Sequence, residues 1–148
     1  MRTGGSVQLD APAQALWARL SDPRALEASL PAVESVELLS ADRFAARVQP
    51  ATALGATPLN LEVAIADARE AEHVRLTGTG DGGEFATTFA VELDLSEHGS
   101  ATEVRWSAEA GFNGVLSSLG QRVLPAILAG QVERVLRAAA AAAQPAPA

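Results

Sequence analysis

Apolar and polar residues alternate along most of the chain between residues 33 and 112, with the period of two that is typical of half-buried β-strands. Short segments with proline, glycine or charged residues interrupt the alternation. The pattern predicts six strands, at residues 33–39, 43–49, 59–68, 74–76, 85–95 and 102–112. A shorter strand is predicted before them at residues 6–10, where Val7 and Leu9 alternate with polar neighbours.

Helical patterns lie on both sides of this strand-rich region. Residues 12–20 and 24–29 predict two short helices, the first with Asp10 as its N-cap and the second ended by Pro31. The longest helical pattern in the sequence runs from Gly114 to Ala143. Because a long sheet has an apolar face to bury, we expect this last helix to cover it.

A proline interrupts the long helical pattern at residue 125. Pro125 removes one helical hydrogen bond. The apolar residues also form two stripes that point in different directions, with Leu116, Leu119, Val123 and Ile127 on one and Leu128, Val132 and Val135 on the other. We therefore predict a kink between residues 121 and 125, with the first half of the helix acting as a gate over whatever lies beneath it.

The predicted order is one strand, two short helices, six strands and one long helix. Short connections between strands indicate antiparallel neighbours. The predicted fold class is α+β, with a curved antiparallel sheet of about seven strands wrapped around a long C-terminal helix. Residues 1–143 are expected to form one domain, and residues 144–148 (QPAPA) a disordered tail.

Composition narrows the classes of partner. The net charge is −7, and every basic residue is arginine. Such an acidic domain is a poor match for nucleic acids, because phosphate groups require a basic surface. The absence of cysteine excludes disulfides, thiol catalysis and cysteine metal sites. No apolar run is long enough for an integral membrane segment and the first residues do not resemble a signal peptide, so a cytoplasmic location is expected.

Few motifs in the sequence can carry chemistry. Residues 78–83 (GTGDGG) satisfy the G-x-G-x-x-G pattern of dinucleotide-binding proteins, but that pattern must open a helix and here a strand follows, so we expect a flexible hairpin turn. His73 and His98 lie beside charged or turn residues and are expected to be exposed rather than to bind a metal. Ser117 and Ser118 have no histidine nearby in the sequence to act as a base. We therefore predict no catalytic residue, no metal and no cofactor.

The apolar strand faces form a hydrophobic core in the first instance, but several of their side chains are small. Ala46, Thr87, Ala108 and Ala110 fill little of the volume under a long helix. Protein interiors otherwise avoid unfilled space. Volume alone leaves a filled core and a ligand cavity equally open.

Four stretches of the sequence, in a fixed order, resemble a known family. They are Gly5-Ser6 with the strand that leads to Ala11-Pro12; Trp17, Leu20, Asp22-Pro23 and Leu26, continuing to Leu30-Pro31 and Val36-Glu37; residues 78–83; and Gly114, Leu116, Leu119, Gly120 and Arg122. With these stretches the chain resembles the helix-grip (SRPBCC) superfamily, which includes START lipid-transfer domains and polyketide cyclases. Within it, the chain is most similar to the carbon monoxide dehydrogenase G-subunit (CoxG) family.

The resemblance implies a helix-grip fold with an internal apolar cavity that binds a lipid, a quinone or another hydrophobic molecule. It also implies an accessory role beside a molybdenum hydroxylase such as carbon monoxide dehydrogenase. On this basis we predict a cavity between the sheet and the C-terminal helix, lined by Leu61, Val63, Ile65, Leu76, Phe85, Thr87, Phe89, Val104, Trp106, Ala108, Phe112, Leu116, Leu119, Val123 and Ile127.

Two classes of function stay open at this point. The first is non-catalytic binding or carriage of a hydrophobic small molecule. The second is an enzyme of the cyclase, dehydratase or hydrolase type that uses the same cavity, since one fold supports many functions. An enzyme would need acids, bases or hydroxyl groups inside the cavity. The predicted lining is mostly aliphatic apart from Thr87, which favours binding.

Overall fold

The computed structural model describes residues 2–28, 33–49, 58–82, 85–114 and 124–143. Its elements in chain order are β1 (Arg2–Leu9), α1 (Ala13–Leu20), α2 (Pro23–Glu27), β2 (Val33–Ser40), β3 (Arg43–Val48), β4 (Leu59–Arg69), β5 (His73–Asp81), β6 (Phe85–His98), β7 (Ala101–Gly114) and α3 (Leu124–Ala143). This order confirms the predicted one. Gly114, however, is the last residue of β7 and not the first residue of the helix. The predicted kink and gate involve residues 121–123, which lie outside the described residues, so both stay predictions.

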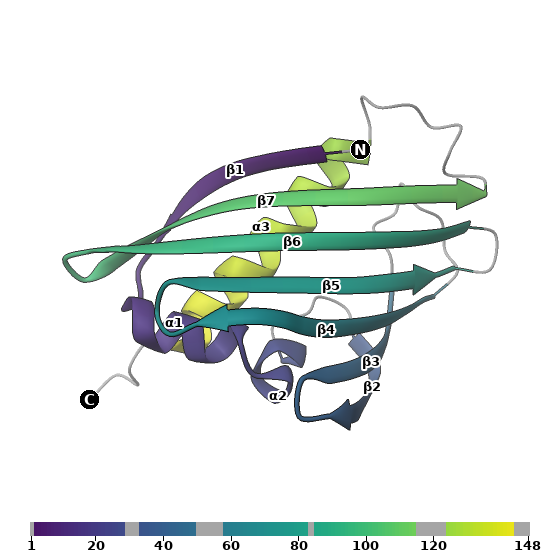
Figure 1. Cartoon of the computed structure of the whole chain (residues 1–148), viewed down its shortest axis with the longest axis horizontal. Coiled ribbons are helices and arrows are strands. Elements are labelled where there is room, and N and C mark those ends of the chain that lie inside the picture. The colour runs from purple at the N-terminus through teal and green to yellow at the C-terminus, as the bar shows by residue number, and fades with distance from the viewer. Residues whose placement is uncertain (1, 29–32, 50–57, 83–84, 115–123, 144–148) are drawn as a thin grey trace.

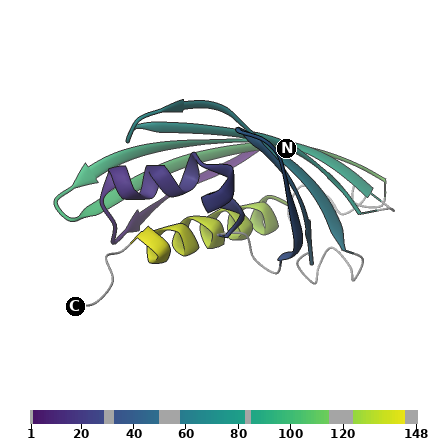
Figure 2. The same ribbon diagram turned by 90° about the horizontal axis from the view of Figure 1, so that it is seen from below.

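The seven strands form one antiparallel sheet in the order β1-β7-β6-β5-β4-β3-β2 (Figure 1). From β2 to β7, each strand pairs with the next one in the sequence, and β1 completes the sheet by pairing with β7. The sheet curves, and the three helices lie on its concave side (Figure 2). The predicted α+β class, with a curved antiparallel sheet around a C-terminal helix, is confirmed.

The C-terminal helix lies beside β1 and α1 (Figure 2). Its second half contributes Leu136 to a core that also contains Leu16 and Leu20 of α1, each at most 1% exposed. The spacing of four residues between the two leucines of α1 places both on one face of that helix. No helix in the described ranges is long and apolar enough to cross a lipid bilayer.

The first helix is attached to the strands by side-chain contacts that local patterns do not reveal. Pro12 occupies its N-cap position, where the sequence predicts Asp10, and provides no side-chain cap. Instead, Oε1 of Glu97 accepts a hydrogen bond of 3.3 Å from the first N–H of the helix. Nε1 of Trp17 donates a hydrogen bond of 3.2 Å to the carbonyl oxygen of His73. These two contacts hold α1 against the ends of β5 and β6.

Residues 78–81 of the glycine-rich stretch are strand and not the hairpin turn that its composition predicts, while Gly82 follows the strand and Gly83 lies outside the described residues. β5 continues to Asp81, so Gly78 and Gly80 are strand residues. A Cβ atom on Gly78 would lie 2.6 Å from the carbonyl oxygen of Glu62 and would also overlap with the ring of Phe89. The glycines therefore permit close packing across the strand, a common reason for glycine inside a sheet.

Candidate functional site

The strand register sorts the concave face of the sheet into rows that cross neighbouring strands, because directly opposite residues point to the same face. One row contains Trp106, Leu93 and Val74. Two rows further along the strands, another contains Ala110, Phe89, Gly78, Val63 and Phe44. Residues far apart in the sequence are thus placed side by side under the helices.

The two ends of this face differ in how completely their side chains are buried. At one end, which we call the packed end, five side chains of the central strands β5, β6 and β7 are at most 7% exposed: Val74, Leu93, Leu95, Val104 and Trp106. At the other end, which we call the half-exposed end, four side chains keep an intermediate exposure: Leu59, Leu61, Thr87 and Phe89. The boundary between the two ends crosses β6 between Val91, which is buried, and Phe89.

The long helix shows the same gradient along its own length. Among its residues with described side chains, the buried ones are all in the second half: Leu136, Ala139 and Ala140. In the first half, Ile127 and Leu128 are only half-buried. Figure 1 shows the first turns of α3 near the N-terminal end of β1 and the last turns near α1. At this end of β1, Arg2 pairs with Glu109 of β7, next to the row of Phe89 and Ala110. The half-exposed parts of helix and sheet therefore lie on the same side of the domain.

Small residues make up much of the half-exposed end: Ala46, Gly78, Gly80, Thr87 and Ala110. The methyl carbon Cγ2 of Thr87 lies 2.9 Å, and Cδ2 of Leu61 lies 3.2 Å, from the position that a Cβ atom on Gly80 would occupy. These larger side chains thus lie close to the glycine, in space that a larger residue at this position would need. Concave sites lined mainly by apolar side chains are typical of sites for hydrophobic ligands. Each half-exposed leucine or phenylalanine would gain roughly 1 kcal/mol if a ligand removed the water that still contacts it.

Polar groups are scarce at this end of the face. Oγ1 of Thr87 donates a hydrogen bond of 2.9 Å to the carbonyl oxygen of Gly111, so the hydroxyl group already has an acceptor. No acidic, basic or histidine side chain occupies a concave-face strand position in the described rows of the half-exposed end. Towards the packed end, the indole Nε1 of Trp106 is buried against Gly5 and has no hydrogen-bond partner among the residues that the structure describes.

The structure brings most of the predicted lining residues onto one face but divides them between its two ends. Leu61, Thr87 and Phe89 lie at the half-exposed end, as does the half-buried Ile127 on the helix. The other lining residues with described side chains lie further towards the packed end or are more fully buried: Val63, Ile65, Leu76, Val104, Trp106 and Ala108. Phe85 and Phe112 share the rows of the half-exposed end by strand register. Leu116, Leu119 and Val123 lie outside the described residues.

Sequence reasoning missed several residues of the half-exposed end. Leu59 alternates with Leu61 and could have been found from the strand pattern alone. Gly78 and Gly80 are spaced by two residues, which also indicates one strand face rather than a turn. Leu128 was assigned to an apolar stripe of the long helix, but its place in the domain could not be predicted, because the orientation of the helix depends on its contact with β1 and α1.

A buried histidine lies outside this face, and its burial contradicts our prediction that it is exposed. His73 is 8% exposed, with Nδ1 at 2.8 Å from Oδ1 of Asp94 and Nε2 at 4.0 Å from Oδ2 of Asp67. Asp67 lies on β4 and Asp94 on β6, the two strands that flank β5, so only the strand pairing brings them to His73. His98 is exposed, as predicted. Within the described ranges, no group of three or more histidine, cysteine or acidic residues is arranged to hold a metal ion.

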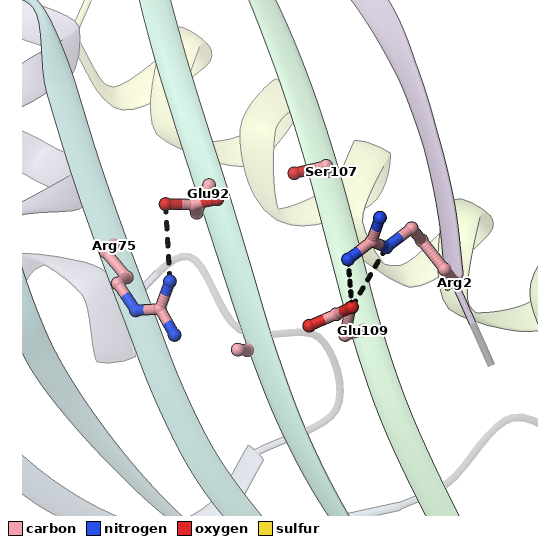
Figure 3. Close-up of a pocket in the computed structure, with 6 residues that line it drawn as sticks. Arg2, Arg75, Glu92, Ser107 and Glu109 are labelled. Carbon is pink, nitrogen blue, oxygen red and sulfur yellow. Dashed lines mark hydrogen bonds and ion pairs between the residues drawn. The ribbon is translucent and has the colours of Figure 1, made fainter.

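The outer face of the sheet has a shallow hollow lined by Arg2, Arg75, Ala90, Glu92, Ser107 and Glu109 (Figure 3). Nη1 of Arg75 lies 3.3 Å from Oε1 of Glu92, and Arg2 pairs with Glu109. All four charged side chains are substantially exposed. Because each arginine already has a carboxylate partner in water, the hollow offers little net charge to a ligand.

Comparison with known proteins adds a family and a fold. The model of the carbon monoxide dehydrogenase G-subunit (CoxG) family matches residues 5–143. A conserved protein from Geobacillus kaustophilus has a similar structure, with a TM-score of 0.87, 21% sequence identity and coverage of 97% of this chain and 95% of that chain. A START superfamily protein from Mycobacterium smegmatis has a TM-score of 0.72 at 13% identity, with 96% of each chain covered. Among curated proteins, none matches this sequence.

Proposed function

The chain belongs to the CoxG family of carbon monoxide dehydrogenase subunits, and from this premise we propose that it binds and carries a hydrophobic small molecule without catalysing a reaction. The proposed ligand is a lipid or a quinone-like molecule. The proposed site lies between the half-exposed end of the sheet and the first half of α3. The START-like fold is consistent with this role, although a fold by itself does not decide function.

The observation that supports this site is the shared gradient of burial in the two layers that face each other. In the sheet, the partly exposed apolar side chains Leu59, Leu61 and Phe89 gather at one end of the domain, and in α3 the buried side chains with a described exposure are confined to the second half, at the other end. A core that was packed throughout would bury Leu61, Phe89 and Leu128 as completely as it buries Leu93. Apolar side chains left partly in water in both layers are what a hydrophobic ligand needs for its own burial.

The chemistry of the half-exposed end favours carriage over catalysis. Its described concave-face residues offer aliphatic and aromatic contacts, and Thr87 already donates its hydroxyl hydrogen to a backbone carbonyl. General acid–base catalysis would require a titratable group within hydrogen-bonding distance of the ligand. The name of the family suggests the partner: we expect the loaded protein to serve a redox enzyme of the carbon monoxide dehydrogenase type, a molybdenum hydroxylase.

Native mass spectrometry of the purified protein tests the ligand. We expect an added mass that organic solvent releases, identified as a lipid or quinone by mass spectrometry of the extract. A long-chain quinone and a phospholipid, added in turn to protein stripped of ligand, should restore the added mass and raise the Tm, because a ligand that binds only the folded state stabilises it. Protein that carries no extractable molecule, and whose Tm responds to neither compound, would show that this proposal is wrong.

A further inference from the structure

One edge of the sheet has no neighbouring strand among the described residues. β2 is the strand at this edge, and within the described part of the chain it pairs only with β3. The other side of its backbone therefore presents N–H and C=O groups that no described strand pairs with. All of its residues from Glu34 to Ser40 are exposed. The large apolar side chains with exposures of 36% to 44% in the described ranges all belong to this strand: Val36, Leu38 and Leu39.

The opposite edge is different. β1 lies beside the 20-residue helix α3, whereas the helix that contacts β2 is α2, which has only five residues (Figure 2). Natural proteins usually protect open edges with lysine, proline, bulges or a covering element. β2 contains neither lysine nor proline, and its register with β3 is irregular only at its two ends, between Val33 and Ser35 and between Leu38 and Ser40. On its outer side, the regular stretch between these irregularities has no partner among the described strands.

The two faces of this stretch have different chemistry. Val36 and Leu38 lie opposite Ala46 and Phe44, which are buried on the concave face. Glu37 lies opposite Ala45 and therefore points to the outer face. A strand added at this edge would place one set of alternate side chains beside the apolar pair and the other set beside the glutamate.

Glu37 is the acidic residue of β2 whose carboxylate has no described partner. The other one, Glu34, has two partners: its Oε2 lies 3.3 Å from Nε of Arg47, and its Oε1 accepts a hydrogen bond of 2.7 Å from Gln49. Glu37 has no ion pair or hydrogen bond with any residue in the described ranges. A basic side chain on an incoming strand would supply the missing opposite charge.

We propose that the edge of β2 binds an extended segment of another protein in which apolar and basic residues alternate, and that this segment extends the sheet by one strand. Backbone hydrogen bonds provide the affinity in this mode of binding, and the alternating side chains provide the specificity. A second copy of this chain fits less well. Its own β2 contains two glutamates and no basic residue, and each copy carries a net charge of −7.

The test uses the whole protein and a labelled peptide of about seven residues, long enough to span a typical strand. The peptide alternates arginine and valine. The first control has the same composition with all arginines before all valines, and the second alternates glutamate and valine. In fluorescence anisotropy at physiological salt, we expect the alternating arginine peptide to bind about tenfold more tightly than either control. Hydrogen exchange should show new protection confined to residues 33–40.

Two modifications separate strand pairing from general attraction between a basic peptide and an acidic protein. Methylation of the backbone nitrogens of either the odd or the even residues of the peptide gives two variants. One should lose binding and the other should keep it, because only every second N–H group of a strand points towards the neighbouring strand. Glu37→Lys should weaken binding of the arginine peptide by about threefold to tenfold and improve binding of the glutamate peptide. Glu70→Lys makes the same change of charge at another exposed site and should alter neither preference.

Several results would overturn this proposal. They are equally tight binding of the control peptide with all arginines before all valines, protection from hydrogen exchange outside β2, or an unchanged preference of Glu37→Lys for the arginine peptide over the glutamate peptide. Concentration-dependent protection of residues 33–40 without any peptide would instead assign the edge to a second copy of this chain. All of these measurements are independent of the hydrophobic ligand, so failure here leaves the proposed function untouched.

Discussion

The packed end and the half-exposed end of the concave face are built from the same strands, yet they bury their side chains to different degrees. In β6, Leu93 is 2% exposed, whereas Phe89, on the same face, is only half-buried. At the packed end, α1 and the second half of α3 contribute buried leucines to one core. At the half-exposed end, small residues and glycines take the place of large side chains. Alternation of apolar residues thus identifies the buried face but not how completely each part of it is filled.

The largest effect that distinguishes the two ends is expected from leucine-to-alanine substitutions. Leu93→Ala at the packed end should lower the free energy of unfolding by about 2–5 kcal/mol, because it leaves a cavity in a filled core. Leu61→Ala at the half-exposed end is the matched control and should cost less than about 1.5 kcal/mol, because this side chain removes less surface from water. Urea unfolding of both variants measures the difference. Equal costs would mean that both ends are packed alike.

The glycines of β5 provide a second comparison. Gly78→Ala should destabilise the protein by about 1–3 kcal/mol, because the new methyl group would meet the backbone of Glu62 and the ring of Phe89. Gly130→Ala in α3 is the matched control, since nothing lies within 4 Å of its Cβ position. This variant should be stabilised by about 0.5–1 kcal/mol through helix propensity. If Gly78→Ala leaves the stability unchanged in thermal or urea unfolding, the close packing of Phe89 against residue 78 does not require glycine at this position.

The last comparison concerns ligand binding instead of stability. Leu61→Gln should weaken binding of a long-chain quinone or phospholipid by about tenfold while the fold persists, because a polar group then faces the ligand in place of an apolar one. Leu39→Gln changes an exposed leucine of β2 in the same way and should leave affinity unchanged. Titration followed by native mass spectrometry measures both. A similar loss in both variants would remove the half-exposed end as the site.

The fold was largely predictable from the sequence, whereas the site was predictable only in part. Strand alternation is a local property, so the faces that carry Leu61, Phe89 and Trp106 could be assigned from neighbouring residues. Burial of His73 could not, because its aspartate partners belong to β4 and β6. The glycine-rich stretch was assigned to a turn because glycine is common in both turns and strands, and the ring of Phe89 that explains Gly78 comes from the next strand.

By itself, the sequence determined the order of the elements, the apolar face of each strand and the family to which the chain belongs, because each of these depends on residues close together along the chain. Only the tertiary structure decided where on the concave face apolar side chains are fully buried and where some of them stay partly exposed. That difference depends on which strand rows lie beneath α1 and the buried second half of α3, and it arises from contacts between residues far apart in the sequence. The position of β2 at the edge was decided in the same way, since strand order and not strand pattern leaves one of its two sides without a partner among the described strands.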